Sequence, residues 1–304
     1  MRVAFFGTPE FGRTVLAALL DAGEEVVLAV SQPDRPRQQR GRSPKEPSPV
    51  KRLAVERELP VVTPQRAGDV LADLERAEPD VCVVAAYGQI LPDALLQSAG
   101  GRWLNVHASL LPAYRGASPV TQAILDGCAE TGVSIMEVVP QLDAGPVLAQ
   151  ATVPVGETDT TGSLSEKLAA AGGRLLAETL PKYQSGKLQP RPQDEAAATM
   201  TRTLRKTDGE IDWSRDAAYL ARFVRAMQPW PGAWTTFSGQ RIVVTAVHAE
   251  DTDGAPGRFE PAPTLQVGTG RGSLVVERLV PAGRSETDGS AWLNGVRQSG
   301  HFGS

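Results

Sequence analysis

The strongest constraint on the fold is a run of six apolar residues at 81–86, Val-Cys-Val-Val-Ala-Ala, in which polar and apolar residues do not alternate. A strand of this kind is buried on both faces, which is typical of a parallel sheet with helices on either side. Similar runs at 3–6 and 26–30 flank a segment whose apolar residues have helical spacing, Val15, Leu16, Leu19 and Leu20. The first half of the chain therefore predicts an α/β fold with a doubly wound, mostly parallel sheet.

The second half changes character after a stretch rich in proline and polar residues at 187–205. Outside this region, further helices are expected at 50–57, 71–76, 119–125 and 163–180, and further strands at 60–62, 104–107 and 133–139.

After residue 205, a helix is expected at 217–227. Four short strands follow it between glycine and proline turns, near 233–236, 241–244, 265–267 and 273–276. Their spacing predicts a small, OB-like β-barrel. We expect a catalytic domain at 1–186, a linker at 187–205 and a β-barrel domain at 206–304.

Composition excludes several classes of protein. With 304 residues, 41% hydrophobic and 22% charged, and a net charge of −4, the chain is not disordered. The apolar runs are far shorter than the roughly 20 residues of a membrane helix. Two cysteines and three histidines suit neither a disulfide framework nor a metal site. We therefore expect a cytoplasmic protein without a metal or a membrane partner, and a monomer because no exposed apolar stripe is evident.

The first glycine turn, Gly7-x-x-x-x-Gly12, lacks the middle glycine of a dinucleotide fingerprint and is best interpreted as a plain turn. Asn105 and His107 are more informative, because residues two apart on an extended segment point to the same side. An amide and an imidazole side by side can both donate hydrogen bonds to a developing oxyanion. A buried histidine satisfied by an asparagine is the structural alternative.

Two nearby segments extend this candidate site. Ser109, Leu110, Leu111 and Pro112 place an apolar pair between a hydroxyl and a proline, a suitable wall for a flat ligand. Asp143 lies in a glycine-containing turn directly after a strand expected to be parallel, and the carboxyl ends of such strands form the ligand crevice. Asp143 could orient His107 or carry its proton. The alternative is an aspartate that only forms the turn.

These residues resemble the formyltransferase family that uses 10-formyltetrahydrofolate. The resemblance extends over essentially the whole chain and is carried by two motifs in the correct order, Asn105-x-His107-x-Ser109-Leu110-Leu111-Pro112 with Arg115-Gly116, and Leu142-Asp143-x-Gly145. It implies a Rossmann-like catalytic domain that transfers a formyl group, with 10-formyltetrahydrofolate as co-substrate and no metal. It further implies that Asn105, His107 and Asp143 are catalytic and that residues 109–112 line the folate site. Whether His107 or Asp143 is the formal base stays open.

Three further segments resemble the family members that act on methionyl initiator tRNA, namely 6–11, 32–36 and 229–234. They imply transfer of the formyl group to the free α-amino group of the esterified methionine, for translation initiation. The basic residues between 35 and 52 agree with a tRNA partner, because they number seven against one acidic residue in a chain that is acidic overall. We expect tRNA contacts from Arg42 above all, and from Arg35, Arg37, Arg40 and Lys45.

Alternatives to this interpretation remain open. A basic loop is often no more than a solvated surface, and residues 206–304 carry ten basic against eleven acidic residues. A tRNA-binding role for the β-barrel domain therefore follows from the resemblance alone. The same catalytic motif would serve a formyltransferase acting on a small amine, such as glycinamide ribonucleotide or an amino sugar-nucleotide. A catalytically inactive tRNA-binding module is the third possibility.

Overall fold

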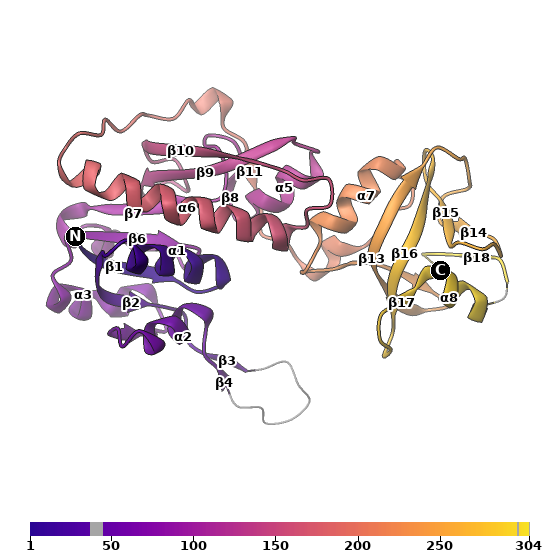
Figure 1. Ribbon diagram of the computed structural model, residues 1–304, viewed down its shortest axis with the longest axis horizontal. Coiled ribbons are helices and arrows are strands. Elements are labelled where there is room, and N and C mark those ends of the chain that lie inside the picture. Colours follow the sequence, from indigo (N-terminus) through magenta and orange to yellow (C-terminus); the bar gives the residue numbers. More distant parts are fainter. Residues whose placement is uncertain (37–44, 297, 304) are drawn as a thin grey trace. The chain divides into compact units, whose positions relative to one another are not determined.

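The computed structural model describes residues 1–36, 45–296 and 298–303. It divides into two compact units, the first comprising 1–116, 130–154 and 165–201, and the second 117–129, 155–164 and 202–304 (Figure 1). Each unit therefore contains segments from more than one part of the chain. The domain boundaries expected at 186 and 206 stay a prediction.

The first unit is built on a seven-stranded sheet with the strand order β10-β9-β7-β6-β1-β2-β5 (Figure 1). Its strands are β1 (Arg2–Gly7), β2 (Glu25–Val30), β5 (Val61–Val62), β6 (Val81–Ala85), β7 (Trp103–His107), β9 (Glu130–Glu137) and β10 (Val147–Pro154). The five strands from β5 to β7 are parallel, and β9 and β10 are antiparallel to their neighbours. The predicted doubly wound, mostly parallel sheet is confirmed.

Strand β9 departs from the expectation for residues 133–139. It runs antiparallel to β7, so that Glu137 at its end pairs with Leu104 near the beginning of β7. The expectation that Asp143 follows a parallel strand is therefore wrong. Asp143 instead reaches Asn105 and His107 from the loop between β9 and β10. The sequence did not reveal strand β10.

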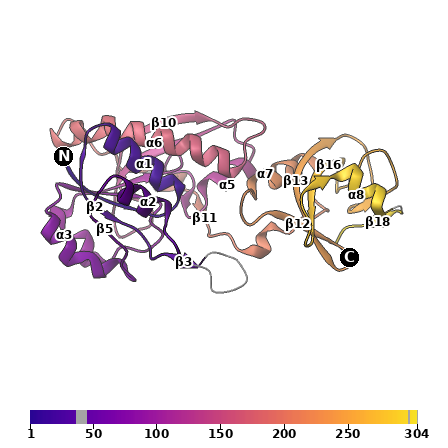
Figure 2. The same cartoon turned by 60° about the horizontal axis from the view of Figure 1, so that its bottom comes forward.

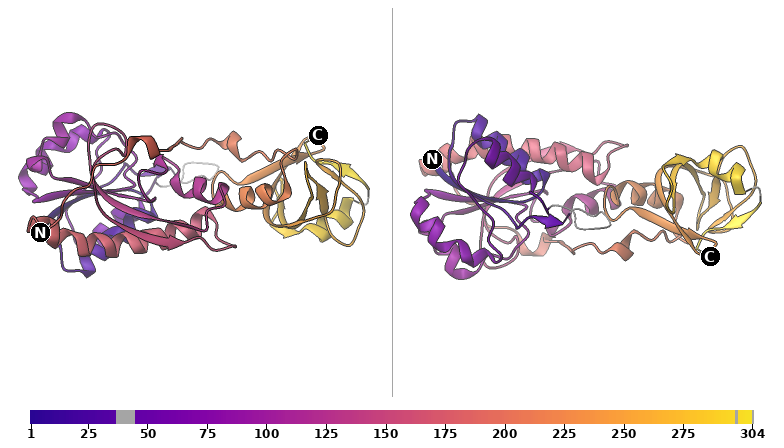
Figure 3. Two further views of the ribbon diagram at one scale, coloured as in Figure 1. Left: turned by 90° about the horizontal axis from the view of Figure 1, so that it is seen from above. Right: turned by 90° about the horizontal axis from the view of Figure 1, so that it is seen from below.

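Helices cover both faces of the sheet (Figure 3). Helix α1 (Glu10–Asp21) and the part of α6 (Thr161–Gln184) in this unit lie on one face, and α3 (Leu71–Ala77) and α4 (Asp93–Leu96) lie on the other. A Cβ atom on Gly172 would lie 2.8 Å from the Val106 side chain, and one on Gly173 would lie 2.5 Å from Cβ of Ala18. The two glycines within α6 thus permit close packing on both the sheet and α1.

Burial of the central strands matches the apolar pattern of the sequence. Ala4 and Phe6 of β1 pack in a cluster with Cys82, Tyr87 and Trp103, while the alternate residues of β1 are equally buried on the other face. Burial raises the pKa of the Cys82 thiol far above its ordinary value. Over the described part of the chain, no helix combines the length and apolar character that crossing a membrane requires.

The smaller elements of the first unit include two strand pairs and one more α-helix. Helix α2 (Pro49–Glu56) begins at Ser48, whose hydroxyl accepts a hydrogen bond from the amide of Lys51. The other elements are β3 (Arg35–Pro36) paired with β4 (Lys45–Glu46), β8 (Arg115–Gly116) paired with β11 (Met200–Thr201), and the 3₁₀ helices η1 (Ala67–Val70), η2 (Ala99–Gly101) and η3 (Glu195–Ala197).

The second unit contains a curled antiparallel sheet, in agreement with the predicted barrel-like domain. Its strands are β12 (Ala233–Phe237), β13 (Gln240–Glu250), β16 (Ser273–Pro281), β15 (Gln266–Gly268), β14 (Arg258–Phe259) and β18 (Gly300–His301) in spatial order, with β17 (Thr287–Asp288) paired to β16. Helix α5 (Pro119–Leu125) lies beside α7 (Ala217–Ala226) (Figure 2). The remaining elements are η4 (Lys206–Gly209) and α8 (Gly289–Val296).

Aromatic side chains fill the interior of this curled sheet. Phe237, Phe259, Trp292 and Phe302 contact one another with ring centroids 4.9 to 6.2 Å apart. Phe259 and Phe302 are almost completely buried, as is Trp213, whose indole N–H donates to Thr235 Oγ1 at 3.1 Å. The tryptophans Trp213 and Trp292 therefore serve the core of this unit.

Candidate active site

The three predicted catalytic residues lie together in the first unit. Asn105 and His107 lie on strand β7, and Asp143 lies in the loop that follows β9. Nδ1 of His107 is 3.7 Å from Oδ2 of Asp143, and Nδ2 of Asn105 is 3.5 Å from Oδ1 of the same carboxylate. The His107 and Asp143 side chains are only 7% and 12% exposed. An amide, an imidazole and a carboxylate thus converge in a largely desolvated site.

The contacts of the His107 ring restrict its tautomer. Nε2 lies 3.0 Å from the backbone carbonyl oxygen of Tyr114, which can only accept a hydrogen bond. Nε2 therefore carries a proton, and Nδ1 faces the Asp143 carboxylate. In the neutral ring Nδ1 directs a lone pair at that carboxylate.

Asn105 retains the ability to donate to a substrate. Its amide nitrogen carries two hydrogens, and the contact of 3.5 Å to Asp143 is long for a hydrogen bond. Such contacts are often loose in the absence of substrate and tighten when the reacting group is bound. The amide can therefore turn toward an oxyanion that forms beside it.

The Asp143 carboxylate is held by the backbone of the Arg115-Gly116 segment. The amide of Gly116 donates to Oδ2 of Asp143 at 2.8 Å. Asp143 itself has a φ of 50°, in the left-handed region that aspartate tolerates better than most residues. Gly145 completes the turn against β9, because a Cβ atom there would lie 1.7 Å from the carbonyl oxygen of Glu137. The glycines of both motifs thus permit close backbone approach around the carboxylate.

Arg115 is buried beneath this turn, with 5% of its surface exposed. Its guanidinium donates two hydrogen bonds to the Glu195 carboxylate, at 2.9 and 2.7 Å, and one from Nε to Oε1 of Gln193 at 3.0 Å. The hydrogen bonds between Arg115 and Glu195 raise the pKa of Arg115 and lower the pKa of the Glu195 carboxyl. The sequence gives no signal for Gln193 and Glu195, because they lie in a segment with the composition of a linker.

The proposed folate segment is well ordered by internal contacts. The Ser109 hydroxyl donates to the carbonyl of Ala113 at 2.6 Å, and the amide of Leu111 donates to Ser134 Oγ at 3.0 Å. Leu111 packs with Met136 and Val147, and Leu110 lies against the position of Gly132. Pro112 follows Leu111 through a cis peptide bond. Contact of these residues with a folate stays a prediction.

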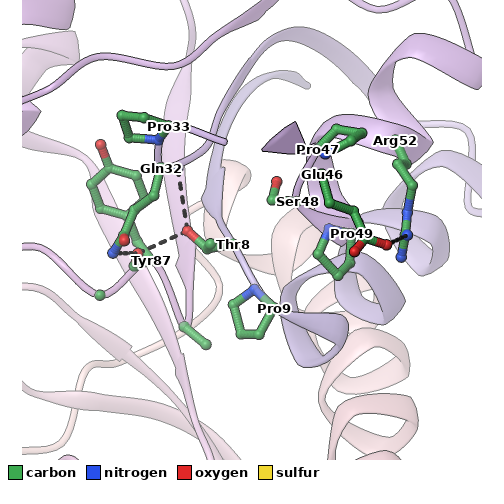
Figure 4. Close-up of a pocket in the computed structure, with 12 residues that line it drawn as sticks. Thr8, Pro9, Gln32, Pro33, Glu46, Pro47, Ser48, Pro49, Arg52 and Tyr87 are labelled. Carbon is green, nitrogen blue, oxygen red and sulfur yellow. Dashed lines mark hydrogen bonds and ion pairs between the residues drawn. The ribbon is translucent and has the colours of Figure 1, made fainter. Parts of the chain in front are cut away.

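A pocket of about 540 Å³ opens at the carboxyl ends of β1, β2 and β6. The strand order reverses between β1 and β6, and ligands of doubly wound sheets bind at such a point. Figure 4 shows the Thr8 hydroxyl donating to the carbonyl of Tyr87 at 2.9 Å, and the Gln32 side chain donating to the same oxygen at 2.8 Å. Much of the remaining wall is proline, at positions 9, 33, 47 and 49.

The proposed tRNA contacts fall largely outside the described residues. Arg37, Arg40 and Arg42 lie in the segment 37–44, which the structure does not describe. Arg35 and Lys45 flank it in the short antiparallel pair of β3 and β4. Arg52, at the pocket wall, pairs with Glu46 at 3.3 Å (Figure 4). Contact of these cations with tRNA stays a prediction.

Comparison with known proteins covers nearly the entire chain. Residues 1–180 match the family described as formyl transferase, and residues 203–297 match the formyl transferase C-terminal domain. In fold, the chain is similar to HypX from Aquifex aeolicus in complex with tetrahydrofolic acid, with a TM-score of 0.65 and 18% identity. That comparison covers 96% of this chain and 47% of HypX.

Curated relatives of similar length are closer in sequence. The methionyl-tRNA formyltransferase of Chloroflexus aurantiacus is 44% identical over 97% of this chain and 97% of its own length. That of Roseiflexus castenholzii is 45% identical over 99% of this chain and 97% of its own length. The chain therefore belongs to the formyl transferase family, in the branch of the methionyl-tRNA formyltransferases.

Proposed function

We propose that this chain transfers the formyl group of 10-formyltetrahydrofolate to the α-amino group of methionine esterified to initiator tRNA. The chemistry rests on one observation, the convergence of Asn105, His107 and Asp143 with separations of 3.5 and 3.7 Å. The choice of acceptor rests on the similarity to methionyl-tRNA formyltransferases over nearly the whole chain. The reaction belongs in the cytoplasm, where translation is initiated.

The reaction begins with attack of the amine nitrogen on the formyl carbon. A C–N bond forms, the carbonyl electron pair moves to oxygen, and a tetrahedral oxyanion results. The Asn105 amide donates a hydrogen bond to that oxygen, and we assign His107 a second donor role, in which its Nε2–H turns from the Tyr114 carbonyl to the oxyanion. Aligned donors of this kind contribute roughly 10²- to 10³-fold each to the rate of acyl transfer.

The attacking nitrogen must also lose a proton. The pair formed by His107 and Asp143 accepts it, directly or through a water molecule, because Nδ1 of His107 faces the carboxylate at 3.7 Å. Collapse of the intermediate then breaks the bond between the formyl carbon and N10 of the folate. The proton passes to N10, so tetrahydrofolate is the leaving group, and the formyl group stays on the nitrogen of methionyl-tRNA.

The two substrates approach from different parts of the sheet edge. We assign the folate to residues 109–112, which follow β7 directly. The acceptor end of the tRNA is assigned to the pocket at Thr8, Gln32 and Tyr87, because Glu46 and Arg52 at its wall adjoin the basic segment. A strongly anionic substrate fits that segment, and its binding should weaken with salt.

The test is a formyl-transfer assay with radiolabelled 10-formyltetrahydrofolate and three acceptors in parallel. These are methionyl initiator tRNA, methionyl elongator tRNA and glycinamide ribonucleotide. Transfer to the initiator alone is expected, and transfer to the small molecule alone would overturn the acceptor assignment. With His107→Ala we expect at least a 10²-fold loss of kcat. An unchanged rate would refute the proposed mechanism.

A further inference from the structure

We propose that Gln193 and Glu195 are positioning residues that hold the Asp143 turn in its reactive geometry. Both lie in the segment 187–201, hereafter the strap, whose composition is that of a connection between domains. The inference rests on the proposed function, since it assigns these residues a role in the same formyl transfer. It is carried by hydrogen bonds that link the strap to Asp143 and, separately, to the loop that contacts His107.

Gln193 holds the turn directly. Its Nε2 donates to the backbone carbonyl of Asp143 at 2.8 Å and to that of Gly145 at 2.7 Å. One amide group thus uses both of its hydrogens on the two carbonyls that bracket Ala144. Because each carbonyl can only accept, no carboxylate or hydroxyl oxygen of similar size could replace both contacts. The position of the Asp143 main chain therefore depends on a donor with two hydrogens.

Arg115 and Glu195 fix the orientation of that amide. Nε of Arg115 donates to Oε1 of Gln193, so the amide oxygen points to the guanidinium and the nitrogen to the turn. A flipped amide would set its oxygen against two carbonyls and its nitrogen against a cation. The Glu195 carboxylate neutralises the buried guanidinium through two hydrogen bonds of 2.7 and 2.9 Å. A chain of hydrogen bonds thus runs from Glu195 through Arg115 and Gln193 to the Asp143 turn.

The strap also contacts the loop that faces His107. Thr199 Oγ1 accepts a hydrogen bond from the amide of Tyr114 at 2.8 Å, and the carbonyl of Tyr114 is the partner of His107 Nε2. The parallel pairing of Met200 with Arg115 continues this attachment. Gly116 permits it, because a Cβ atom there would lie 2.2 Å from the carbonyl oxygen of Thr201. One segment thus supports both members of the catalytic pair.

Replacement of Gln193 by glutamate separates positioning from packing. The variant Gln193→Glu keeps the volume of the side chain and its acceptor for Arg115, but it removes both donors to the turn. We expect kcat to fall about 10- to 100-fold while KM for the folate changes less than twofold, because misplacement of a reacting group acts on the chemical step. Gln189→Glu is the matched control, since Gln189 is exposed in the same segment; its kcat should stay within twofold of the parent.

A double-mutant cycle tests whether Gln193 acts through Asp143. In the Asp143→Asn background, Gln193→Glu is expected to lower kcat less than threefold further, because the group that it positions has already lost its function. An equal loss in both backgrounds, or an unchanged kcat for Gln193→Glu in the parent chain, overturns the proposal. If Gln193→Glu does not fold, Glu195→Gln takes its place in the cycle, since Glu195 is 73% exposed. Its expected loss is about 3- to 10-fold.

Amide hydrogen exchange provides a readout that needs no substrate. Peptides covering residues 138–147 should exchange faster in Gln193→Glu than in the parent or in Gln189→Glu, because the turn opens more often. Unchanged exchange there overturns the positioning role, whatever the acceptor proves to be. A parent chain that transfers no formyl group to any acceptor would instead refute the proposed function, so the two failures are distinguishable.

Discussion

The Asp143 turn and the pocket at Thr8 lie on the same sheet but are built differently. In the turn, the carboxylate of Asp143 and the carbonyls of Asp143 and Gly145 all have partners within the protein. In the pocket, four of the twelve lining residues are prolines, and the side chains of Thr8 and Gln32 both donate to the Tyr87 carbonyl. The turn is therefore fixed by hydrogen bonds within the protein, while the pocket leaves room for a bound group.

The glycines of the two regions show the same difference. A Cβ atom on Gly145 would lie 1.7 Å from a backbone oxygen, which cannot move without disturbing β9. A Cβ atom on Gly88 would lie 2.6 Å from the end of the Gln32 side chain, which can rotate away. The turn is therefore less tolerant of substitution than the pocket.

The largest expected effect concerns the chemistry of the turn. Asp143→Asn keeps the shape of the side chain and removes its charge, so proton transfer through His107 loses its acceptor. We expect kcat to fall about 10²- to 10⁴-fold, with little change in either KM. Steady-state kinetics with both substrates provides the measurement. A kcat within threefold of the parent would show that the carboxylate is dispensable.

The second prediction compares the two glycines by stability. Gly145→Ala should lower the free energy of unfolding by about 2 to 3 kcal/mol, since the new methyl group meets backbone. Gly88→Ala should lower it by only about 1 kcal/mol, mostly from the φ of +79° at that position. Urea denaturation of the two variants checks this order. Equal losses would contradict the distinction between a rigid turn and an adaptable pocket.

The third prediction concerns binding in the pocket. Thr8→Val removes the hydroxyl that donates to the Tyr87 carbonyl and keeps the volume of the side chain. Loss of this hydrogen bond should make the ordered pocket wall about 1 kcal/mol less favourable. We therefore expect KM for methionyl-tRNA to rise about fivefold, while kcat and the KM for folate stay unchanged. Kinetics with each substrate varied in turn separates these parameters. A fall in kcat alone would show that Thr8 affects the chemical step and not the binding of methionyl-tRNA.

The smallest expected effect is a pH dependence of the strap. Hydrogen bonds from Arg115 lower the pKa of the Glu195 carboxyl below its ordinary value of 4.5, so the folded state favours the ionised form. This stabilisation is fully present above pH 4.5 and is lost as the pH falls through the lower, folded pKa. The difference in Tm between the parent and Glu195→Gln should shrink on acidification below pH 4.5. A constant difference from pH 7 to pH 3 would rule out the linkage.

Much of the fold and site could be predicted because the relevant signals are local. The apolar run at 81–86 identifies a strand buried on both faces, as β6 is. Asn105 and His107 share one side of an extended segment, and the structure brings both to Asp143. The motif spacing also led to the correct family. Periodicity and short spacing survive folding because they depend on neighbours in the chain.

Other features depended on the tertiary structure. The direction of β9 could not be inferred, because an apolar strand has the same pattern in parallel and antiparallel sheets, and the path of the chain to Asp143 depends on that direction. The strap was equally hidden, because polar and proline-rich segments look alike whether they are solvated or docked. Gln193 donates a hydrogen bond to the Asp143 carbonyl, although the two residues are 50 positions apart in the sequence. The sequence by itself thus determined the parallel part of the sheet and the family, and it singled out Asn105, His107 and Asp143. Long-range pairing alone decided how these groups are held.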